Sequence, residues 1–312
     1  MMVWLDEVEP GGPPWGGVAA LGNFDGVHVG HQALLARAQA LAEALGVEAL
    51  ALTFEPHPAA VLRPQSLPGL LTPLEEKVRW LESYGVSRVV VARFDRAFAS
   101  LEPEGFLEQV LAERLGVRGV VVGDDFTFGH QARGRVPLLR SWSQARGIGA
   151  EVIPAVGRQG ERVSSSRIRQ ALLAGAFDEV VAMLGHPYGV VGRVVTGHGR
   201  GRTLGYPTAN LELDPQQLPP PEGVYLAEAV VLGAEPERPW PALAVYSRRP
   251  TFGSGEPAFE VFLLDFRGDL YSQRLRVLLI QRLRGIIRFP GPAELQAQIE
   301  EDFQQARRYF GL

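Results

Sequence analysis

Two histidines, His28 and His31, flank Val29-Gly30 and are spaced so that both could act on one substrate. They end the segment Gly22–His31, GNFDGVHVGH, which follows an apolar run and precedes a helical pattern. Residues three apart share a face at a helix start, and a helix N-terminus attracts phosphate. Imidazole N–H groups can donate to charge that develops on the α-phosphate of ATP and on leaving pyrophosphate. The pattern favours a nucleotidyl-transfer site, with His28 and His31 catalytic and Gly30 leaving room for the anion, over incidental surface histidines.

Three further segments end strand patterns or open a helix and could complete this site. Phe54–Pro58 (FEPHP) brings His57 to the end of a strand, where it could equally form a rigid turn. Val122–Gly129 (VGDDFTFG) offers a carboxylate and aromatic rings to which a ring system could dock, and Val163–Arg169 (VSSSRIR) offers hydroxyls and arginines for phosphate or a helix cap. The residues predicted to bind nucleotide or ring here are Asn23, Ser164, Ser165, Arg169, His57, Asp125, Phe126 and Phe128.

A second group of residues lies far along the chain and has the character of a phosphate and metal site. The Gly/Arg-rich stretch 192–210 ends in Pro-Thr-Ala-Asn and lacks the Gly-Lys-Ser/Thr core of a Walker A loop. Thr208 and Asn210 would share one side of an extended segment, and two neutral oxygen ligands can hold a hydrated Mg²⁺ that bridges to phosphates. Glu260 interrupts an apolar strand, so it is either paired with an arginine or acts as a general base for a hydroxyl.

Two periodicities position these residues. Between residues 17 and 185, short apolar runs alternate with helical patterns, which predicts a parallel sheet with helices on both faces and ligands at the carboxyl ends of its strands. The expected strands are 17–21, 48–54, 88–92, 119–122 and 151–153. After Gly185-His186-Pro187 the runs follow each other without helices, which predicts an antiparallel sheet or small barrel. A closing helix is expected at 292–309, and the domains are predicted as 1–185 and 186–312.

Composition excludes several classes of protein. The chain has no cysteine, so disulfides and thiolate metal sites are excluded. Residues 186–312 carry 14 basic and 14 acidic groups, which opposes a nucleic-acid-binding barrel. There is no signal-peptide pattern and no apolar run of membrane-spanning length, so a cytoplasmic protein without a membrane partner is expected. Of 31 basic residues only Lys77 is lysine, and Asn23 and Asn210 are the only asparagines.

Taken together, the motifs resemble the bacterial bifunctional riboflavin kinase/FAD synthetase family. HVGH alone resembles only the nucleotidyltransferase superfamily, whereas GNFDGVHVGHQ with FEPHP, VGDDFTFG, SSSRIR, PTAN and the Glu260 strand resembles this family over nearly the whole chain. The resemblance implies a Rossmann-like α/β nucleotidyltransferase domain, then a six-stranded antiparallel β-barrel with a C-terminal helix. It implies ATP-dependent phosphorylation of riboflavin to FMN with release of ADP, and adenylylation of FMN to FAD with release of pyrophosphate.

The resemblance also implies roles within the barrel. Glu260 would be the catalytic base, and Thr208 and Asn210 would bind Mg²⁺ and phosphate. The residues implied to bind ATP phosphates are Gly197, Gly199, Arg202 and Gly205. The chain departs from the family pattern at Ser247, at Phe262 in place of a histidine, and near Gly285, where an acidic residue is missing.

Two other functions fit parts of the sequence. A nucleotidyltransferase for a different phosphorylated substrate could carry a non-catalytic barrel, although the PTAN segment and Glu260 oppose this. The barrel could instead bind nucleic acid, which its charge balance opposes.

Overall fold

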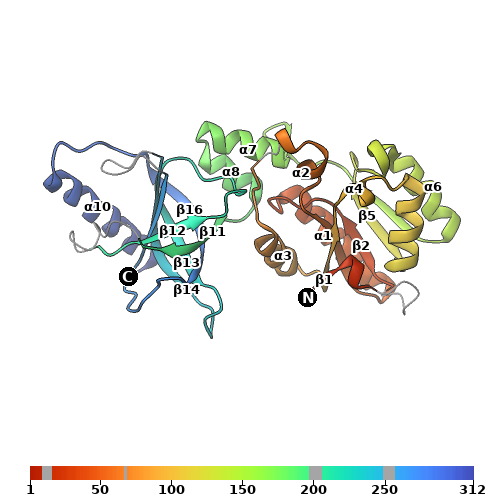
Figure 1. Ribbon diagram of the computed structural model, residues 1–312, viewed down its shortest axis with the longest axis horizontal. Coiled ribbons are helices and arrows are strands. Elements are labelled where there is room, and N and C mark those ends of the chain that lie inside the picture. The colour runs from red at the N-terminus through yellow and green to blue at the C-terminus, as the bar shows by residue number, and fades with distance from the viewer. Residues whose placement is uncertain (9–15, 67–68, 197–205, 249–256) are drawn as a thin grey trace. The chain divides into compact units, whose positions relative to one another are not determined.

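The computed structural model describes residues 1–8, 16–66, 69–196, 206–248 and 257–312 (Figure 1). Its contacts divide the chain into two compact units. The first comprises Met1–Gly69 and Leu74–Ser165, and the second comprises Leu70–Pro73 and Ser166–Leu312.

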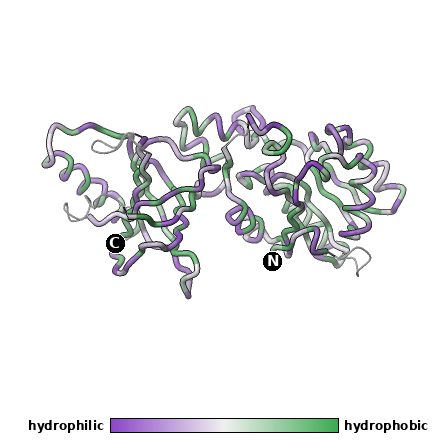
Figure 2. Tube along the Cα trace, in the orientation of Figure 1, coloured by the Kyte–Doolittle hydropathy of each residue, from purple (hydrophilic) through white to green (hydrophobic). Residues whose placement is uncertain are grey.

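The first unit is built on a six-stranded parallel sheet in the order β1-β4-β3-β2-β5-β8. The strands are β1 (Met2–Trp4), β2 (Val18–Leu21), β3 (Ala49–Glu55), β4 (Arg88–Arg93), β5 (Gly119–Gly123) and β8 (Gly149–Ile153). All five predicted strands are present, and the edge strand β1 is additional. The central strands are hydrophobic along most of their length (Figure 2), as expected where both faces of a sheet are covered.

Helices cover both faces of this sheet, and alternate strand residues face two separate cores. Val18 and Ala20 pack with α1 (Val29–Leu45) and α3 (Leu74–Ser83). Ala19 and Leu21 pack with the π-helical segment η3 (Phe106–Arg114), which continues α5 (Pro103–Gly105), and with α6 (Val136–Arg146). The shorter elements are η1 (Leu5–Glu7), α2 (Pro58–Leu62), η2 (Pro64–Ser66), α4 (Arg96–Ala99), β6 (Thr127–Phe128), η4 (His130–Ala132), β7 (Gly134–Arg135), β9 (Gly157–Arg158) and β10 (Glu161–Arg162).

The second unit is a closed antiparallel barrel in the order β11-β12-β15-β14-β13-β16. The strands are β11 (Tyr188–Val195), β12 (Ala209–Leu213), β13 (Gly223–Val231), β14 (Pro239–Ser247), β15 (Ala258–Leu263) and β16 (Arg274–Arg284). This confirms the predicted fold class and decides between an open sheet and a barrel. Closure removes the unpaired strand edges that a small antiparallel sheet would otherwise expose.

The outer face of the barrel is partly covered by α10 (Pro292–Phe310), the predicted C-terminal helix. Leu226, Leu243 and Phe262 lie opposite one another on β13, β14 and β15. They pack in one apolar cluster with Phe303 and Ala306 of α10. Because side chains alternate along a strand, the neighbouring residues of these strands fill the barrel interior.

Two helices that precede the barrel in the sequence belong to the second unit by their contacts. They are α7 (Ser165–Ala174), which the second unit takes from Ser166 onward, and α8 (Phe177–Leu184). Phe177 packs edge-on against the fully buried Tyr225 of the barrel, with ring centroids 5.0 Å apart. Leu70 also joins this unit, because it exchanges backbone hydrogen bonds with Gln216 and Leu218. The contacts therefore place the division near Ser165, whereas the sequence favoured Gly185, and the functional boundary stays a prediction.

In the parts of the chain that the structure describes, no helix is both long and apolar enough to pass through a membrane.

These contacts predict that a fragment of residues 166–312 is more stable than one of residues 186–312. The shorter fragment loses the buried side chains of Phe177, Val180, Met183 and Leu184. At about 1.5–3 kcal/mol for each side chain, the loss in free energy of unfolding is roughly 5 kcal/mol or more. Denaturant unfolding of both fragments measures it, and equal midpoints would assign the two helices to the first unit.

Candidate active sites

The turn from β2 into α1 has a strained backbone at two bulky residues. Phe24 has φ 50° and Val27 has φ 36°, which is the left-handed region that side chains of this size rarely adopt. Each such residue costs about 1–3 kcal/mol and persists only where its surroundings enforce it. Both side chains are fully buried in the core beneath α1, and the Val27 N–H donates to the Phe24 carbonyl at 3.1 Å. The core therefore fixes the turn that delivers His28.

The structure brings His28 and His31 together as a stacked pair. Their ring centroids lie 3.7 Å apart with an interplanar angle of 15°. His28 caps α1, and its Nδ1 accepts the backbone N–H of His31 at 3.4 Å. A neutral imidazole that accepts at Nδ1 carries its proton on Nε2, so Nε2–H of His28 is the group that can donate to a ligand.

The environment of His31 disfavours a positive charge on its imidazole. Burial, followed by the charges of His28 and Lys77, holds the pKa of His31 well below its ordinary value. The buried Nδ1 of His31 has no hydrogen-bond partner among the described residues. A neutral His31 at the N-terminus of a 17-residue helix can donate to phosphate without adding a second positive charge beside His28.

Glycine at position 30 leaves the space beside His28 open. A Cβ there would lie 3.1 Å from both Cε1 and Nδ1 of the His28 ring. His28 is only 6% exposed and stacks on His31, so it has little room to move aside.

Two other residues predicted to bind nucleotide, Asn23 and Ser165, take part in hydrogen bonds at or beside this turn. The Ser165 hydroxyl donates to the Asp25 carbonyl at 2.8 Å, which joins the start of α7 to the turn. Asn23 is exposed, and its carbonyl accepts from the Thr53 hydroxyl at 3.0 Å. Ser164 is half-buried beside Ser165. Arg169 lies one turn further along α7, within the second unit, and its phosphate role stays a prediction.

A cavity of about 770 Å³ in the first unit is lined by three of the four residues predicted to bind a ring system. These are His57, Phe126 and Phe128, and Asn23 also lines it. The Phe126 and Phe128 rings stack with centroids 5.6 Å apart. His57 caps α2, with Nδ1 accepting the Ala59 N–H at 3.2 Å, so it also serves the rigid turn.

Asp125 does not line this cavity. Its carboxylate is exposed and pairs with Arg162 at 2.7 Å, and the neighbouring Asp124 carboxylate accepts the Ala155 N–H at 3.2 Å. The acidic pair of the VGDDFTFG segment therefore holds a surface hairpin, while its two phenylalanines turn inward.

The sequence analysis missed several residues that line the cavity. The aromatic ones are Phe54, Phe94, Phe98 and Phe106, and the basic ones are Arg63, Arg96 and His130. The sequence could have indicated Phe94, Arg96 and Phe98, because they directly follow the β4 strand pattern. The segment after a parallel strand lies at the carboxyl edge of the sheet, where ligands bind. An apolar cavity with a few cationic groups at its wall suits an aromatic ligand that carries a negative charge.

In the barrel, Thr208, Asn210 and Glu260 form one polar group on the outer face. Asn210 lies directly opposite Glu260 in the pairing of β12 with β15, so their side chains share a face. The Thr208 hydroxyl donates to Glu260 Oε2 at 3.0 Å. All three are half-buried, whereas Phe259 and Val261, on either side of Glu260, are buried in the barrel. Alternation along β15 thus explains how a carboxylate interrupts an apolar strand.

The donor set of this group fits a magnesium ion. Hydroxyl, amide and carboxylate oxygens are hard ligands of the kind that Mg²⁺ prefers. A hydroxyl can donate to Glu260 while its lone pairs remain available to a cation. No cluster of three or more histidine, cysteine or acidic residues occurs within the described ranges, so a cation here would be held partly by phosphates and water.

Aromatic side chains and α10 border this polar group. Tyr206 stacks on Phe303 with centroids 4.5 Å apart, and its hydroxyl donates to Glu300 at 2.6 Å. Phe262, one of the departures from the family pattern, packs edge-on against Phe303 at 4.5 Å. A larger apolar contact between the barrel and α10 therefore occupies the position of the usual histidine.

The other departures have ordinary structural surroundings. Ser247 is buried at the end of β14 opposite Ala258. Just before Gly285, Arg284 pairs with Asp302 of α10 at 2.6 Å. The predicted ATP-binding residues Gly197, Gly199, Arg202 and Gly205 lie outside the described residues, and their roles stay predictions.

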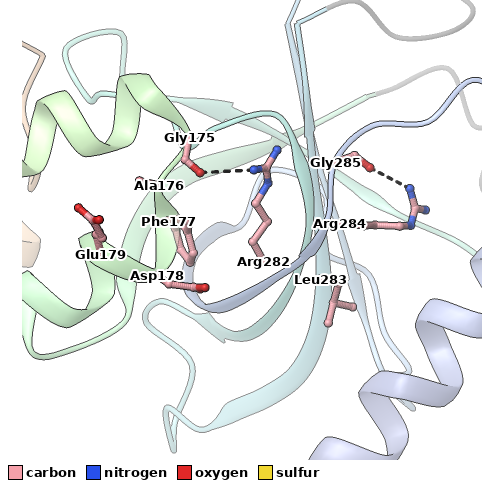
Figure 3. Close-up of a pocket in the computed structure, with 9 residues that line it drawn as sticks. All are labelled: Gly175, Ala176, Phe177, Asp178, Glu179, Arg282, Leu283, Arg284 and Gly285. Carbon is pink, nitrogen blue, oxygen red and sulfur yellow. Dashed lines mark hydrogen bonds between the residues drawn. The ribbon is translucent and has the colours of Figure 1, made fainter.

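A second cavity, of about 460 Å³, lies between α8 and the end of β16 (Figure 3). Its two arginines are already engaged. Arg282 donates to the carbonyls of Gly175 and Glu222 at 3.4 and 2.5 Å, and Arg284 binds Asp302. Asp178 and Glu179 also line the cavity and add negative charge, which opposes the binding of an anion there.

Comparison with known families gives two matches on this chain. A model of FAD synthetase matches residues 14–167, and a model of riboflavin kinase matches residues 184–310. Residues 168–183, which include most of α7 and α8, belong to neither range.

Individual proteins match over nearly the whole chain. Proteins named bifunctional riboflavin kinase/FMN adenylyltransferase from Escherichia coli K12 and Bacillus subtilis 168 are 39% and 37% identical. The matches cover 96% and 94% of this chain and 95% and 92% of those proteins. A crystal structure described as a macrolide-efflux protein from Streptococcus pneumoniae has a TM-score of 0.84, with 30% identity over 98% of each chain.

The geometry of the histidine pair predicts that Gly30→Ala slows nucleotidyl transfer by at least about tenfold, because displacing a positioned group by a fraction of an ångström is costly. The rate of FAD formation from FMN measures this. The matched control is Gly149→Ala: that glycine also lies in the first unit, at the start of β8, and a Cβ there would meet other atoms only at ordinary contact distances of 3.6 Å or more. An unchanged rate in a folded Gly30→Ala protein would show that the spacing of the rings is not critical.

Proposed function

Because the chain belongs to the family of bifunctional riboflavin kinases/FMN adenylyltransferases, we propose how its residues divide the two reactions. The protein phosphorylates riboflavin with ATP to give FMN and ADP, and it adenylylates FMN with a second ATP to give FAD and pyrophosphate. The proposed assignment places adenylyl transfer at His28 and His31 and phosphorylation at Glu260. The observation that carries it is that the two polar groups lie in separate folded units with separate cores.

In the adenylyl transfer, an FMN phosphate oxygen attacks the α-phosphorus of ATP, and the bond to pyrophosphate breaks. The His28–His31 pair and the N-terminus of α1 would donate hydrogen bonds to the phosphoryl oxygens as negative charge grows on them. The aromatic cavity beside His57 and Phe128 would hold the flavin ring. Its volume of about 770 Å³ is in the range of cavities that enclose a ligand of this size.

In the phosphorylation, a riboflavin hydroxyl attacks the γ-phosphorus of ATP, and ADP leaves. Glu260 would accept the hydroxyl proton, and the hydrogen bond from Thr208 fixes one of its oxygens. When bound, Mg²⁺ neutralises charge on the phosphates, and Thr208 with Asn210 would hold it. Ser164, Ser165 and Arg169 are proposed for ATP in the first reaction, and Gly197, Gly199, Arg202 and Gly205 for ATP in the second.

The alternatives raised by the sequence are less well supported. A non-catalytic barrel does not agree with a match to riboflavin kinase over residues 184–310. The proposed boundary between the activities stays at 185/186, and a cytoplasmic location stays a prediction of the sequence.

Two substitutions test the assignment of the sites. His31→Ala should lower FAD formation from FMN by about 10²–10³, the usual cost of a lost donor to developing charge, and leave FMN formation from riboflavin unchanged. Glu260→Gln keeps shape and hydrogen bonding but takes no proton, so it should slow FMN formation by about 10²–10⁴ and leave FAD formation from FMN normal. The two rates are measured separately, starting from riboflavin and from FMN. Equal loss of both activities in a folded variant would favour a single shared site.

Thr208→Val tests the support of the base. It keeps the side-chain volume but removes the donor to Glu260 and an oxygen ligand, so FMN formation should fall about 10–100-fold and require more Mg²⁺. A titration of the rate with Mg²⁺ measures both effects. Thr53→Val is the matched control, because that hydroxyl lies in the first unit. A normal rate at limiting Mg²⁺ would exclude the proposed role of Thr208.

A further inference from the structure

Lys77 is the sole lysine of a chain whose other 30 basic residues are arginine, and it is buried. Its exposed fraction is 3%, and it lies on the buried face of α3 with Val78 and Leu81. Those two apolar side chains pack in the same core cluster as Phe24 and Val27, the strained residues of the β2–α1 turn. Helix α3 and the turn that positions the histidine pair therefore contribute to the same core.

Two acidic residues from different strand ends offset the charge of this lysine. Burial, the largest cause, lowers the pKa of Lys77, while the charges of Asp25 and Glu55 act to raise it. Asp25 lies between the two strained residues of the turn and is 1% exposed, and Glu55 is the last residue of β3. A buried charge is tolerated when it is paired, and these two carboxylates, one in the turn after β2 and one at the end of β3, are the acidic groups whose charges act on the Lys77 ammonium.

The lysine also acts on the histidine pair. The titratable groups that influence His31 are its stacking partner His28, from the start of α1, and Lys77, from α3. Both lower the pKa of His31, so the ammonium helps to keep the imidazole uncharged. An uncharged His31 can retain the stacked geometry with His28, which two adjacent cations would oppose by repulsion.

We propose that Lys77 is a positioning residue for adenylyl transfer, which supports the strained β2–α1 turn and the end of β3 through Asp25 and Glu55. It acts through Asp25, Glu55 and His31 and need not contact the substrates. The inference rests on the proposed assignment of adenylyl transfer to His28 and His31. Lysine suits the place because its ammonium is compact, whereas a guanidinium is planar and wider.

The rate test compares Lys77→Met and Lys77→Arg with the control Arg88→Met in the full-length protein. Arg88 is a partly exposed residue of the same unit, ion-paired with Glu48 at 2.7 Å and remote from the proposed chemistry. We expect FAD formation from FMN to fall by at least about tenfold in both Lys77 variants, because the turn loses its anchor. FMN formation from riboflavin should stay within about twofold, and the control should change neither rate. A normal rate of FAD formation in folded Lys77→Met would overturn the proposal.

A pH profile separates positioning from a merely structural role. Without the cation of Lys77 the pKa of His31 rises, so the acidic limb of FAD formation in Lys77→Met should move to higher pH by about half a unit or more. A lower rate with an unmoved limb would reduce Lys77 to a structural residue and refute the proposal. If the unsubstituted protein makes no FAD from FMN, the assigned function fails and not this inference alone.

A spectroscopic test applies even if Lys77→Met does not fold. Because the chain has one lysine, isotope labelling of lysine nitrogen gives the full-length protein a single ammonium signal in NMR. We expect this signal to titrate below the ordinary range of lysine, and to titrate lower still in Asp25→Asn, where an acidic partner is lost. An ordinary titration, or an identical midpoint in both proteins, would contradict the buried cluster.

Discussion

Both faces of the sheet and the interior of the barrel are buried, and this burial restricts the positions at which polar, reactive side chains can lie. In the first unit, alternate residues of every central strand face one of two cores, so polar groups are left only at the strand ends and in the turns that follow. In the second unit the barrel interior is filled, and Glu260 takes an outward position between two inward apolar residues. The two candidate sites thus differ in kind: one lies at the ends of strands, and the other lies on the outside of a closed wall.

The same constraint explains why the sequence predicted the fold well. Continuous apolar runs separated by helical patterns predicted the four central strands β2, β3, β4 and β5, because a strand that is covered on both sides has no polar face. They also predicted the edge strand β8, which is only partly buried. The edge strand β1 was missed because three residues at the sheet edge are only partly buried. The contacts divide the chain near Ser165, whereas the sequence favoured a domain boundary at Gly185, because the packing of α8 on the barrel through Phe177 leaves no local mark in sequence.

The candidate sites were predictable to the extent that chemistry is local in sequence. The pairs His28 with His31 and Thr208 with Asn210 lie within one turn or one extended segment, so spacing alone groups them. Asp125 was grouped with its aromatic neighbours because it adjoins them, but its carboxylate pairs with Arg162 instead. Phe94 and Phe98 were missed because they reach the cavity from another strand, and such long-range grouping needs the order of strands in the sheet.

The composition of this chain is strongly biased against lysine and asparagine, so the few positions that carry these residues are informative. Basic residues in this chain are almost always arginine. At the surface an ion pair contributes little to stability, so arginine and lysine are about equally suitable there. A buried cation is different, because desolvation penalises it heavily unless its acidic partners are placed around it. The one lysine occupies such a place, beside a turn whose strained backbone needs support. The two asparagines lie at the two candidate sites, Asn23 at the turn and cavity and Asn210 opposite Glu260. The single lysine and the two asparagines therefore lie at positions where the shape of the side chain matters as well as its charge or polarity.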